Sequence, residues 1–382
     1  MTGAEATLRC ERCRQDYPSD APVWRCACGG ALDLMWTPGR VVPDGVQSRP
    51  PDLWRYAEAL PPLARRVSLG EPMTPLVAVE RQGRPVGLKC DYLLPTGSYK
   101  DRGSALLMSR LASIGITRAV EDSSGNAAAS LAAYAARAGI ALTVFCPASA
   151  SPGKLAQIRC YGATLRLIEG PRPRATEALL QHVAETGEFY ASHLWDPYFV
   201  EGIKTVAYEL CEQDGWRGPD AVVCPVGAGS ILLGLHRGFV ELVEAKLIPR
   251  LPRLFAAQAA NVSPVYQAFR AQARDVAPAE APRPTLAEGI ALPRPVRGGH
   301  MLRALHESGG GVAAVGEDEI RDGVRALGRL GFCVEPTSAV VWPALGHLEA
   351  QGLVDRRERV VLFLSGFGLK ASAALADITT TA

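Results

Sequence analysis

Residues 95–103 read PTGSYKDRG, and their central feature is a lysine, Lys100, that directly follows a tight Pro/Gly turn. A run of helical character, residues 104–111, begins right after this stretch. A lysine at a junction between a turn and a helix can be held in one place, where its amine can react covalently with an aldehyde. The alternative is an ordinary surface lysine, but a cation is electrostatically unfavourable at the start of a helix.

Two later segments place small and polar residues between a strand-like run and a helical run. Main-chain N–H groups at the start of a helix bind carboxylates and phosphates, and small residues let such a ligand approach closely. Taken singly, each segment is also compatible with a helix cap or a tight βα turn. The residues are Ser123, Ser124, Gly125 and Asn126 in the first segment and Gly227, Ala228, Gly229 and Ser230 in the second.

Short apolar runs of strand character alternate with helical runs from residue 85 onward. Residues 86–93 and 119–124 are typical of strands, and residues 104–115 and 127–139 are typical of helices. This βα alternation predicts parallel sheets that are covered by helices. We therefore expect an α/β fold with two parallel-sheet αβα domains and a small N-terminal extension.

The expected domain boundaries follow the same pattern. Residues 1–36 form the extension, residues 37–103 and 196–382 form a large domain, and residues 104–195 form a smaller one. Residues 37–62 are rich in proline and polar side chains, which is typical of a linker.

The composition is that of an ordinary globular enzyme. Apolar residues make up 48% of the 382 residues and charged residues 21%, with 41 basic and 39 acidic side chains and a net charge of +2. This balance argues against a broad nucleic-acid or membrane surface. No apolar run approaches the ~20 residues that a membrane span requires, and the first residues lack the apolar core of a signal peptide. We expect a cytoplasmic protein.

Four of the ten cysteines are clustered near the N-terminus. Cys10 and Cys13 form a C-x2-C pair, and Cys26 and Cys28 form a C-x-C pair. Two close pairs of thiolates favour a closed, tetrahedral, structural zinc site, because a segment this short buries too little apolar surface to fold unaided. The alternative is a small lobe without metal. The other six are expected to be buried thiols: Cys90, Cys146, Cys160, Cys211, Cys224 and Cys333.

These motifs, in this order, resemble the pyridoxal-phosphate enzymes of the tryptophan-synthase β fold (fold type II), and among them the threonine synthases. The resemblance covers nearly the whole chain. Residues 69–76, LGEPMTPL, are similar to the L-G-E-x-x-T-P-L entry segment of threonine synthases, and residues 364–370, LSGFGLK, are similar to a C-terminal motif of that family. Many threonine-synthase-like proteins also carry an N-terminal zinc ribbon.

Specific roles come to this sequence with the resemblance. Pyridoxal 5'-phosphate would bind covalently to Lys100, between the two domains, and the freed amine would then move protons at the substrate α-carbon. The Asn126 amide would face the phenolic oxygen of the cofactor, residues 227–230 its phosphate, and Ser365 its pyridine nitrogen. Main-chain groups of residues 123–126 would bind the substrate carboxylate. We also expect a homodimer.

The resemblance implies that O-phosphohomoserine and water are converted to threonine and phosphate by γ-elimination and β-addition. This sequence departs from the family pattern at the phosphate loop, at Ala127 and at Phe367, where the family has a threonine and a histidine. Residues 287–290, AEGI, are more similar to the A-D-G-I of serine and threonine dehydratases.

Three interpretations therefore remain. The first is a threonine synthase, the second is another β-eliminating or β-replacing enzyme of the same fold, and the third is a binding protein that uses the enzyme body as a scaffold. A phosphorylated substrate needs a second anion pocket, for which the candidates are Ser151, Lys154 and Arg159. Three further residues are interpreted as surface or satisfied core residues rather than as substrate ligands: His193, Arg297 and His300.

Overall fold

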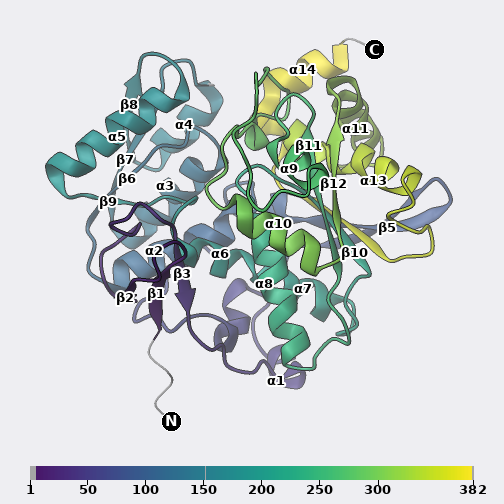
Figure 1. The fold of residues 1–382 in the computed structure, drawn as a ribbon, viewed down its shortest axis with the longest axis horizontal. Coiled ribbons are helices and arrows are strands. Elements are labelled where there is room, and N and C mark those ends of the chain that lie inside the picture. The colour runs from purple at the N-terminus through teal and green to yellow at the C-terminus, as the bar shows by residue number, and fades with distance from the viewer. Residues whose placement is uncertain (1–5, 151, 381–382) are drawn as a thin grey trace. The chain divides into compact units, whose positions relative to one another are not determined.

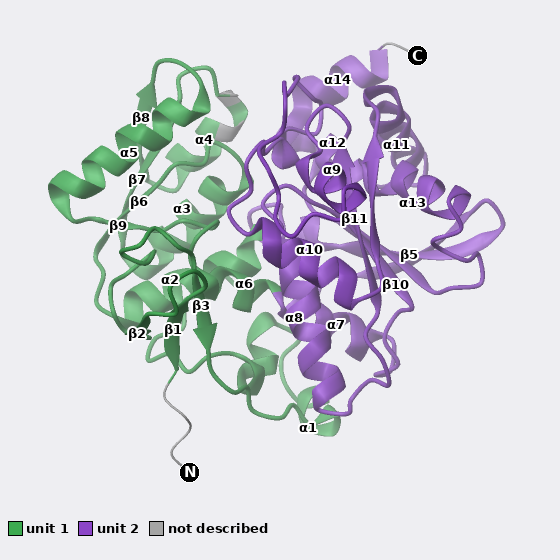
Figure 2. Cartoon of the chain, viewed as in Figure 1, with its two compact units in different colours: residues 1–72, 100–203 green, residues 73–99, 204–382 purple. Residues whose placement is uncertain are grey.

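The computed structural model describes residues 6–150 and 152–380. The chain divides into two compact units (Figures 1 and 2). Unit 1 contains residues 1–72 and 100–203, and unit 2 contains residues 73–99 and 204–382. The chain therefore passes from unit 2 into unit 1 at the peptide bond that precedes Lys100. This division does not set residues 1–36 apart, so the expected boundary at residue 36 stays a prediction.

A four-stranded parallel sheet is the centre of unit 1, with strand order β8-β7-β6-β9. Its strands are β6 (Arg118–Glu121), β7 (Ala141–Pro147), β8 (Thr164–Ile168) and β9 (Phe189–Tyr190). Helices alternate with these strands, as the apolar pattern predicts. They are α2 (Lys100–Ser113), α3 (Asn126–Ala138), α4 (Pro152–Cys160), α5 (Arg172–Thr186) and α6 (Pro197–Ile203).

The N-terminal part of unit 1 is a small antiparallel sheet in the order β2-β1-β3. Its strands are β1 (Thr7–Cys10), β2 (Asp16–Pro18) and β3 (Leu32–Met35). Tyr198 of α6 completes the small apolar core of this sheet, and Trp36 donates a hydrogen bond to Glu201 of the same helix at 3.2 Å. The expected linker that follows carries two short helices, α1 (Pro43–Gln47) and η1 (Leu53–Ala59).

A six-stranded sheet in the order β12-β11-β10-β13-β5-β4 is the centre of unit 2. All neighbours are parallel except β4 and β5, which form an antiparallel hairpin. The central strands β10 and β13 are buried along their whole length, as expected for a parallel sheet covered on both faces. The strands are β4 (Leu76–Arg81), β5 (Arg84–Cys90), β10 (Ala221–Pro225), β11 (Arg253–Ala259), β12 (Gly311–Val315) and β13 (Val360–Leu364).

Helices cover this sheet and connect its strands (Figure 1). The longer ones are α7 (Thr205–Gln213), α8 (Ser230–Glu244), α10 (Gly298–Glu307), α11 (Glu317–Arg329), α13 (Val341–Ala350) and α14 (Ser372–Thr380). The shorter ones are η2 (Asp91–Leu93), α9 (Pro264–Arg270), η3 (Glu288–Ile290), α12 (Pro336–Ala339) and η4 (Gly368–Ala371).

The α/β fold with parallel sheets is confirmed, and one smaller expectation is wrong. Cys160 and Cys333 are exposed, whereas the other four dispersed cysteines are buried as expected. Cys160 is the last residue of α4, and Cys333 lies in the turn after α11, so both fall at ends of elements where apolar neighbours in sequence do not ensure burial. Within the described residues, no helix is long and apolar enough to cross a membrane.

Candidate functional site

Lys100 is the first residue of α2, and its side chain is only 9% exposed. Its Nζ lies 6.0 Å from the centre of the Phe199 ring, which α6 contributes. The next residue, Asp101, accepts a 2.6 Å hydrogen bond from Ser130 of α3, so α2 is tied to the helix that follows the polar quartet. An amine held in this way is largely withdrawn from water, which suits a covalent role better than a surface role.

The quartet at residues 123–126 links strand β6 to helix α3. Ser123 is buried, and its Oγ accepts a 3.2 Å hydrogen bond from the N–H of Gly125. Asn126 is the first residue of α3, a 13-residue helix. The helix dipole places a partial positive charge at this N-terminus. Main-chain N–H groups at the start of a helix can donate hydrogen bonds to a carboxylate.

The glycine-rich turn of unit 2 lies between β10 and α8. Gly229 has a φ of +83°, and a Cβ there would lie 2.2 Å from Sδ of Met301. A Cβ on Gly227 would lie 2.7 Å from Cα of Ile290. Only glycine fits at both positions, so the main chain is not covered by side chains there. The turn leads directly into the N-terminus of the 15-residue helix α8. Such a turn can hold a phosphate.

Ser365 follows strand β13 and is buried. Its Oγ lies 2.9 Å from Oγ of Ser338, which also accepts hydrogen bonds from the N–H groups of Ser365 and Gly366. The two side chains form a neutral pair of hydroxyls. A neutral hydroxyl can share a hydrogen bond with a pyridine nitrogen but does not force it to carry a proton.

Residues 98 and 99 are bonded to both of these unit 2 segments. Ser98 forms a main-chain bridge with Gly366, and the N–H of Tyr99 donates to the carbonyl of Ser365 at 3.0 Å. The Tyr99 hydroxyl lies 2.9 Å from Oγ of Ser230. Unit 2 by itself therefore brings residues 98 and 99, which directly precede Lys100, together with the glycine turn and the end of β13.

Ser98 and Ser338 were not singled out by sequence reasoning. Ser98 is fully buried, and its Oγ has no hydrogen-bond partner among the described residues. Buried hydroxyls are normally paired, so this one calls for a ligand. Its place in the lysine stretch, two residues before Lys100, was the available signal.

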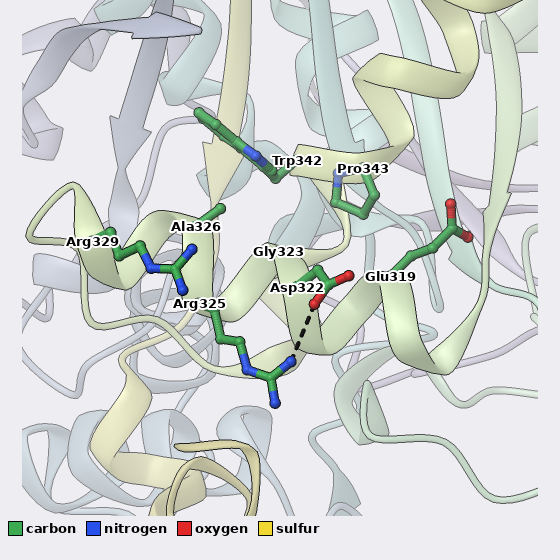
Figure 3. Close-up of a pocket in the computed structure, with 8 residues that line it drawn as sticks. All are labelled: Glu319, Asp322, Gly323, Arg325, Ala326, Arg329, Trp342 and Pro343. Carbon is green, nitrogen blue, oxygen red and sulfur yellow. Dashed lines mark hydrogen bonds and ion pairs between the residues drawn. The ribbon is translucent and has the colours of Figure 1, made fainter. Parts of the chain in front are cut away.

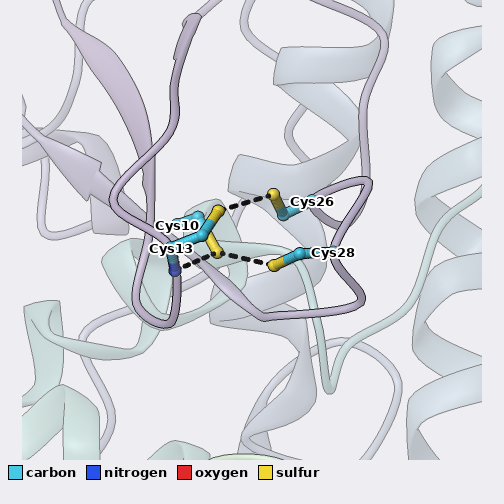
Figure 4. Close-up of side chains that lie close together, drawn as sticks. All are labelled: Cys10, Cys13, Cys26 and Cys28. Carbon is cyan, nitrogen blue, oxygen red and sulfur yellow. Dashed lines mark hydrogen bonds between the residues drawn. The ribbon is translucent and has the colours of Figure 1, made fainter.

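The four N-terminal cysteines lie close together at the C-terminal end of β1 (Figure 4). Sγ of Cys10 lies 3.5 Å from Sγ of Cys28, and the Cys13 and Cys26 sulfurs are also 3.5 Å apart. Four thiolates around a zinc ion at about 2.3 Å would be about 3.8 Å apart, so the cluster has nearly the size of such a site. The distances are far beyond the ~2.05 Å of a disulfide.

Three local features bear on the ligands of this cluster. A hydrogen bond with the Tyr17 hydroxyl is the main cause that lowers the pKa of Cys26 to about 6, which favours its thiolate. The hydrogen bond from the N–H of Gln15 lowers the pKa of Cys13, but hydrogen bonds with Cys26 and Cys28 outweigh it and raise this pKa to about 12. A Cβ on Gly30 would lie 2.7 Å from Sγ of Cys10, so glycine leaves room for the sulfur.

Among the remaining residues discussed from the sequence are the candidates for a second anion pocket and His193. Arg159 is exposed, and Ser151 and the Lys154 side chain lie outside the described residues, so the suggested second anion pocket is not tested. His193 is buried and bonded to Glu121, as expected for a satisfied core residue.

A surface pocket of about 650 Å³ lies between α11 and α13 (Figure 3). Trp342 and Pro343 line it beside an ion pair in which Arg325 contacts Asp322 at 3.2 Å. None of its lining residues belongs to the predicted cofactor set. We therefore do not identify it with the site.

Comparison with known proteins decides the family. Residues 67–366 match the family described as "Pyridoxal-phosphate dependent enzyme". The threonine synthase of Methanocaldococcus jannaschii is 35% identical over 375 residues, 95% of this chain and 92% of that protein. This chain belongs to the threonine synthase group of the pyridoxal-phosphate-dependent enzymes. The threonine synthase of Methanosarcina acetivorans is 32% identical over 381 residues, 97% of this chain and 94% of that protein.

Solved structures of pyridoxal-phosphate enzymes share the fold of the present chain. The crystal structure of a T.th. threonine deaminase superposes with a TM-score of 0.68 at 28% identity, covering 79% of this chain and 94% of the deaminase. A fungal L-serine ammonia-lyase from Rhizomucor miehei has a TM-score of 0.71 at 20% identity, covering 81% and 98%. The second likeness shows the fold alone.

The residues of this pyridoxal-phosphate enzyme fit the cofactor. In unit 1, the buried amine of Lys100 could take the aldehyde of the cofactor. Within unit 2, the bare glycine turn could hold its phosphate and the neutral hydroxyl after β13 could face its pyridine nitrogen, and Oγ of Ser98 has no hydrogen-bond partner among the described residues. Both the expected enzyme class and the expected cofactor are confirmed at the level of the family.

Proposed function

We propose that this protein is a threonine synthase that converts O-phosphohomoserine and water to threonine and phosphate. The observation that carries the proposal is similarity to threonine synthases over almost the whole chain. Bound pyridoxal 5'-phosphate would supply an electron sink for the carbanion formed at the substrate α-carbon.

The side chains of this enzyme would then divide the work. The amine of Lys100 would hold the cofactor at rest and, once released, would take and return protons at the substrate α- and β-carbons. Main-chain N–H groups of residues 123–126 would hold the substrate carboxylate, and those of residues 227–230 the cofactor phosphate. The Asn126 amide and the Ser365 hydroxyl would orient the cofactor ring, and burial of Lys100 limits the access of water.

A second candidate is a dehydratase that forms a ketoacid and ammonia from serine or threonine. Two observations favour it. The fold is shared with the T.th. threonine deaminase at 28% identity. In addition, residues 287–290, AEGI, resemble the A-D-G-I of serine and threonine dehydratases, and they lie against the glycine turn, because a Cβ on Gly227 would lie 2.7 Å from Cα of Ile290.

Product analysis separates the two functions. We would incubate the purified holoenzyme with O-phosphohomoserine, L-serine and L-threonine separately and identify the products. Threonine and phosphate from the first substrate support the proposal. Ketoacid from the hydroxy amino acids, with no turnover of O-phosphohomoserine, supports the dehydratase and rejects the synthase. Absence of any turnover, together with no cofactor binding, would favour the third interpretation, a binding protein.

We also propose a structural zinc ion at Cys10, Cys13, Cys26 and Cys28, supported by the size of the cluster. Neither histidine nor a carboxylate is part of this set, so no open catalytic position is implied. A homodimer is proposed on the family resemblance alone, and sedimentation velocity of the holoenzyme tests it.

A further inference from the structure

Glu121 and His193 form a buried pair that the proposed function does not use. Glu121 ends strand β6 and has no exposed surface, and His193 is 7% exposed. Oε1 of Glu121 lies 2.8 Å from Nδ1 of His193. Oε2 of Glu121 has no hydrogen-bond partner among the described residues.

This geometry matches a protonated carboxyl group better than a carboxylate. A carboxylate presents two charged oxygens that both seek donors, and Oε2 has none within hydrogen-bond distance among the described residues. A carboxylic acid needs one acceptor for its O–H, and Nδ1 of a neutral histidine provides it. An ionised carboxylate with one unbonded oxygen would carry a large desolvation cost at this depth.

Burial favours the same state. It is the main cause that raises the pKa of Glu121 well above its usual range, and the charge of Asp122 raises it further, whereas Arg172, the main-chain N–H of Asp122 and Lys100 lower this pKa without outweighing burial. Burial also lowers the pKa of His193 well below its usual range, with Lys100 and Arg172 as further causes. The charged or titratable groups of unit 1 that face the pair are Lys100 of α2, Asp122 after β6, Arg172 of α5 and Tyr190 of β9.

The pair is close to the reactive amine. Lys100 acts electrostatically on both members, and the His193 ring packs edge-on against Phe199 at 5.9 Å. The same Phe199 ring lies 6.0 Å from Nζ of Lys100. A full negative charge on Glu121 would therefore stabilise the ammonium form of Lys100, which can neither bind an aldehyde nor accept a proton.

We propose that Glu121 is a positioning residue that carries a proton at neutral pH, donates it in a hydrogen bond to Nδ1 of His193, and so keeps a negative charge away from Lys100. The bond also fixes the histidine tautomer, because Nε2 must then carry the hydrogen. His193 thus presents a neutral N–H donor on the other side of its ring. The role near Lys100 rests on the proposed function, whereas the protonation state does not.

Stability gives a test with a definite sign. If Glu121 is protonated in the folded holoenzyme, its folded-state pKa exceeds the unfolded value of about 4.3. The folded state then binds the proton more tightly than the unfolded state. The free energy of unfolding therefore falls as the pH rises from the unfolded pKa towards the folded-state pKa. Glu121→Gln removes this loss and keeps a donor for Nδ1. The variant should be more stable than the wild type at pH 7.5, by a margin that grows between about pH 5 and pH 8.

Glu188→Gln is the matched control. Glu188 accepts hydrogen bonds from Arg118 at 2.6 Å and lies 2.9 Å from Nε2 of His182, so it is a paired carboxylate. Its substitution should destabilise the protein at pH 7.5, which is the opposite sign. If Glu121→Gln is also destabilising at pH 7.5, Glu121 is ionised and the proposal is wrong.

Infrared spectroscopy tests the proton directly. At pH 7.5 the wild type should show a carboxylic-acid C=O band that Glu121→Gln lacks and Glu188→Gln retains. Absence of the band in the wild type overturns the proposal whether or not Lys100 binds the cofactor, so this result is independent of the proposed function.

Kinetics test the positioning role. Glu121→Gln should retain kcat within about threefold at pH 7.5, and its alkaline limb should move to higher pH because no carboxylate can form beside Lys100. Glu121→Leu should lower kcat roughly 10- to 100-fold, the size of effect seen when metal-bound histidines lose the partner that orients them, because the His193 ring that packs against Phe199 beside Lys100 loses its partner. An unchanged alkaline limb in Glu121→Gln would refute the link to Lys100.

Discussion

The hydroxyl oxygen of Tyr99 lies 2.9 Å from Oγ of Ser230, and this contact joins the residue before Lys100 to the first residue of helix α8. The N–H of Tyr99 also bonds to the carbonyl of Ser365. Tyr99 therefore ties the glycine turn and the end of β13 to the point where the chain enters α2. These bonds fix the main chain of unit 2 up to Tyr99, the residue that precedes Lys100.

Tyr99→Phe should weaken cofactor binding without unfolding the protein. The change removes one hydrogen bond between Tyr99 and Ser230, worth about 1 kcal/mol, which corresponds to roughly fivefold in the dissociation constant. Spectroscopic titration of the cofactor-free protein with pyridoxal 5'-phosphate measures this shift. Tyr266→Phe is the control, since Tyr266 is half-buried in α9 and its hydroxyl accepts one weak hydrogen bond, from Arg270 at 3.4 Å. Equal affinities for the Tyr99 variant and the wild type would contradict the assigned role.

Lys100→Ala should abolish the covalent attachment of the cofactor and reduce turnover by roughly 10³-fold or more, because both the attachment point and the base are lost. Borohydride treatment of the wild type should fix the cofactor to a peptide that contains Lys100, and mass spectrometry identifies it. Lys246→Ala, in the loop after α8, serves as the control and should behave as the wild type. A Lys100 variant with full turnover would exclude the assignment.

Much of this fold follows from local pattern. The βα alternation predicted both parallel sheets because strands such as β13, with the sequence VVLFL, are continuous apolar runs that only a doubly covered sheet accommodates. The four cysteines were found from spacing, since turns bring close pairs together. Tyr198 of α6 shares the apolar core of Cys10 and Cys26, but it lies far along the chain and gave no local signal.

Other parts of the site depend on contacts that a sequence does not contain. Ser98 and Ser338 are ordinary serines until the fold buries them, and Glu121 becomes unusual only because the fold buries it next to His193. The exposure of Cys333 has the same origin, because burial is decided by tertiary packing rather than by apolar neighbours in sequence.

Freshly prepared protein should contain about one zinc ion per chain, bound by the four N-terminal thiolates. Cys10→Ser combined with Cys13→Ser should lose the metal and destabilise the small sheet, because metal binding and folding are coupled in such segments. Elemental analysis and limited proteolysis measure the two effects. Cys160→Ser is the matched control, since Cys160 is an exposed thiol outside the cluster. Metal-free wild-type protein with an intact, protease-resistant N-terminus would refute the zinc site.

Ser365 should decide the type of reaction. The group proposed to face the pyridine nitrogen is the hydroxyl of this serine, which is neutral. Its hydrogen-bond partner in the structure, Oγ of Ser338 at 2.9 Å, is neutral as well. A neutral partner stabilises an α-carbanion less than a carboxylate would, which favours prompt loss of a leaving group over transamination. Ser365→Asp should therefore raise the rate of abortive transamination relative to the normal reaction.

The measured quantity is the rate of the ketoacid-forming transamination half-reaction divided by the rate of phosphate release from O-phosphohomoserine. It is determined for the wild type and for two variants. Ser365→Ala is the control, because it removes the hydroxyl without adding charge, and it should lower the rate without raising that ratio. The Asp variant also places a carboxylate beside Ser338, so its cofactor content is measured first to separate lost binding from altered chemistry. A cofactor-loaded Asp variant with the wild-type ratio would show that the group after β13 does not control the fate of the carbanion.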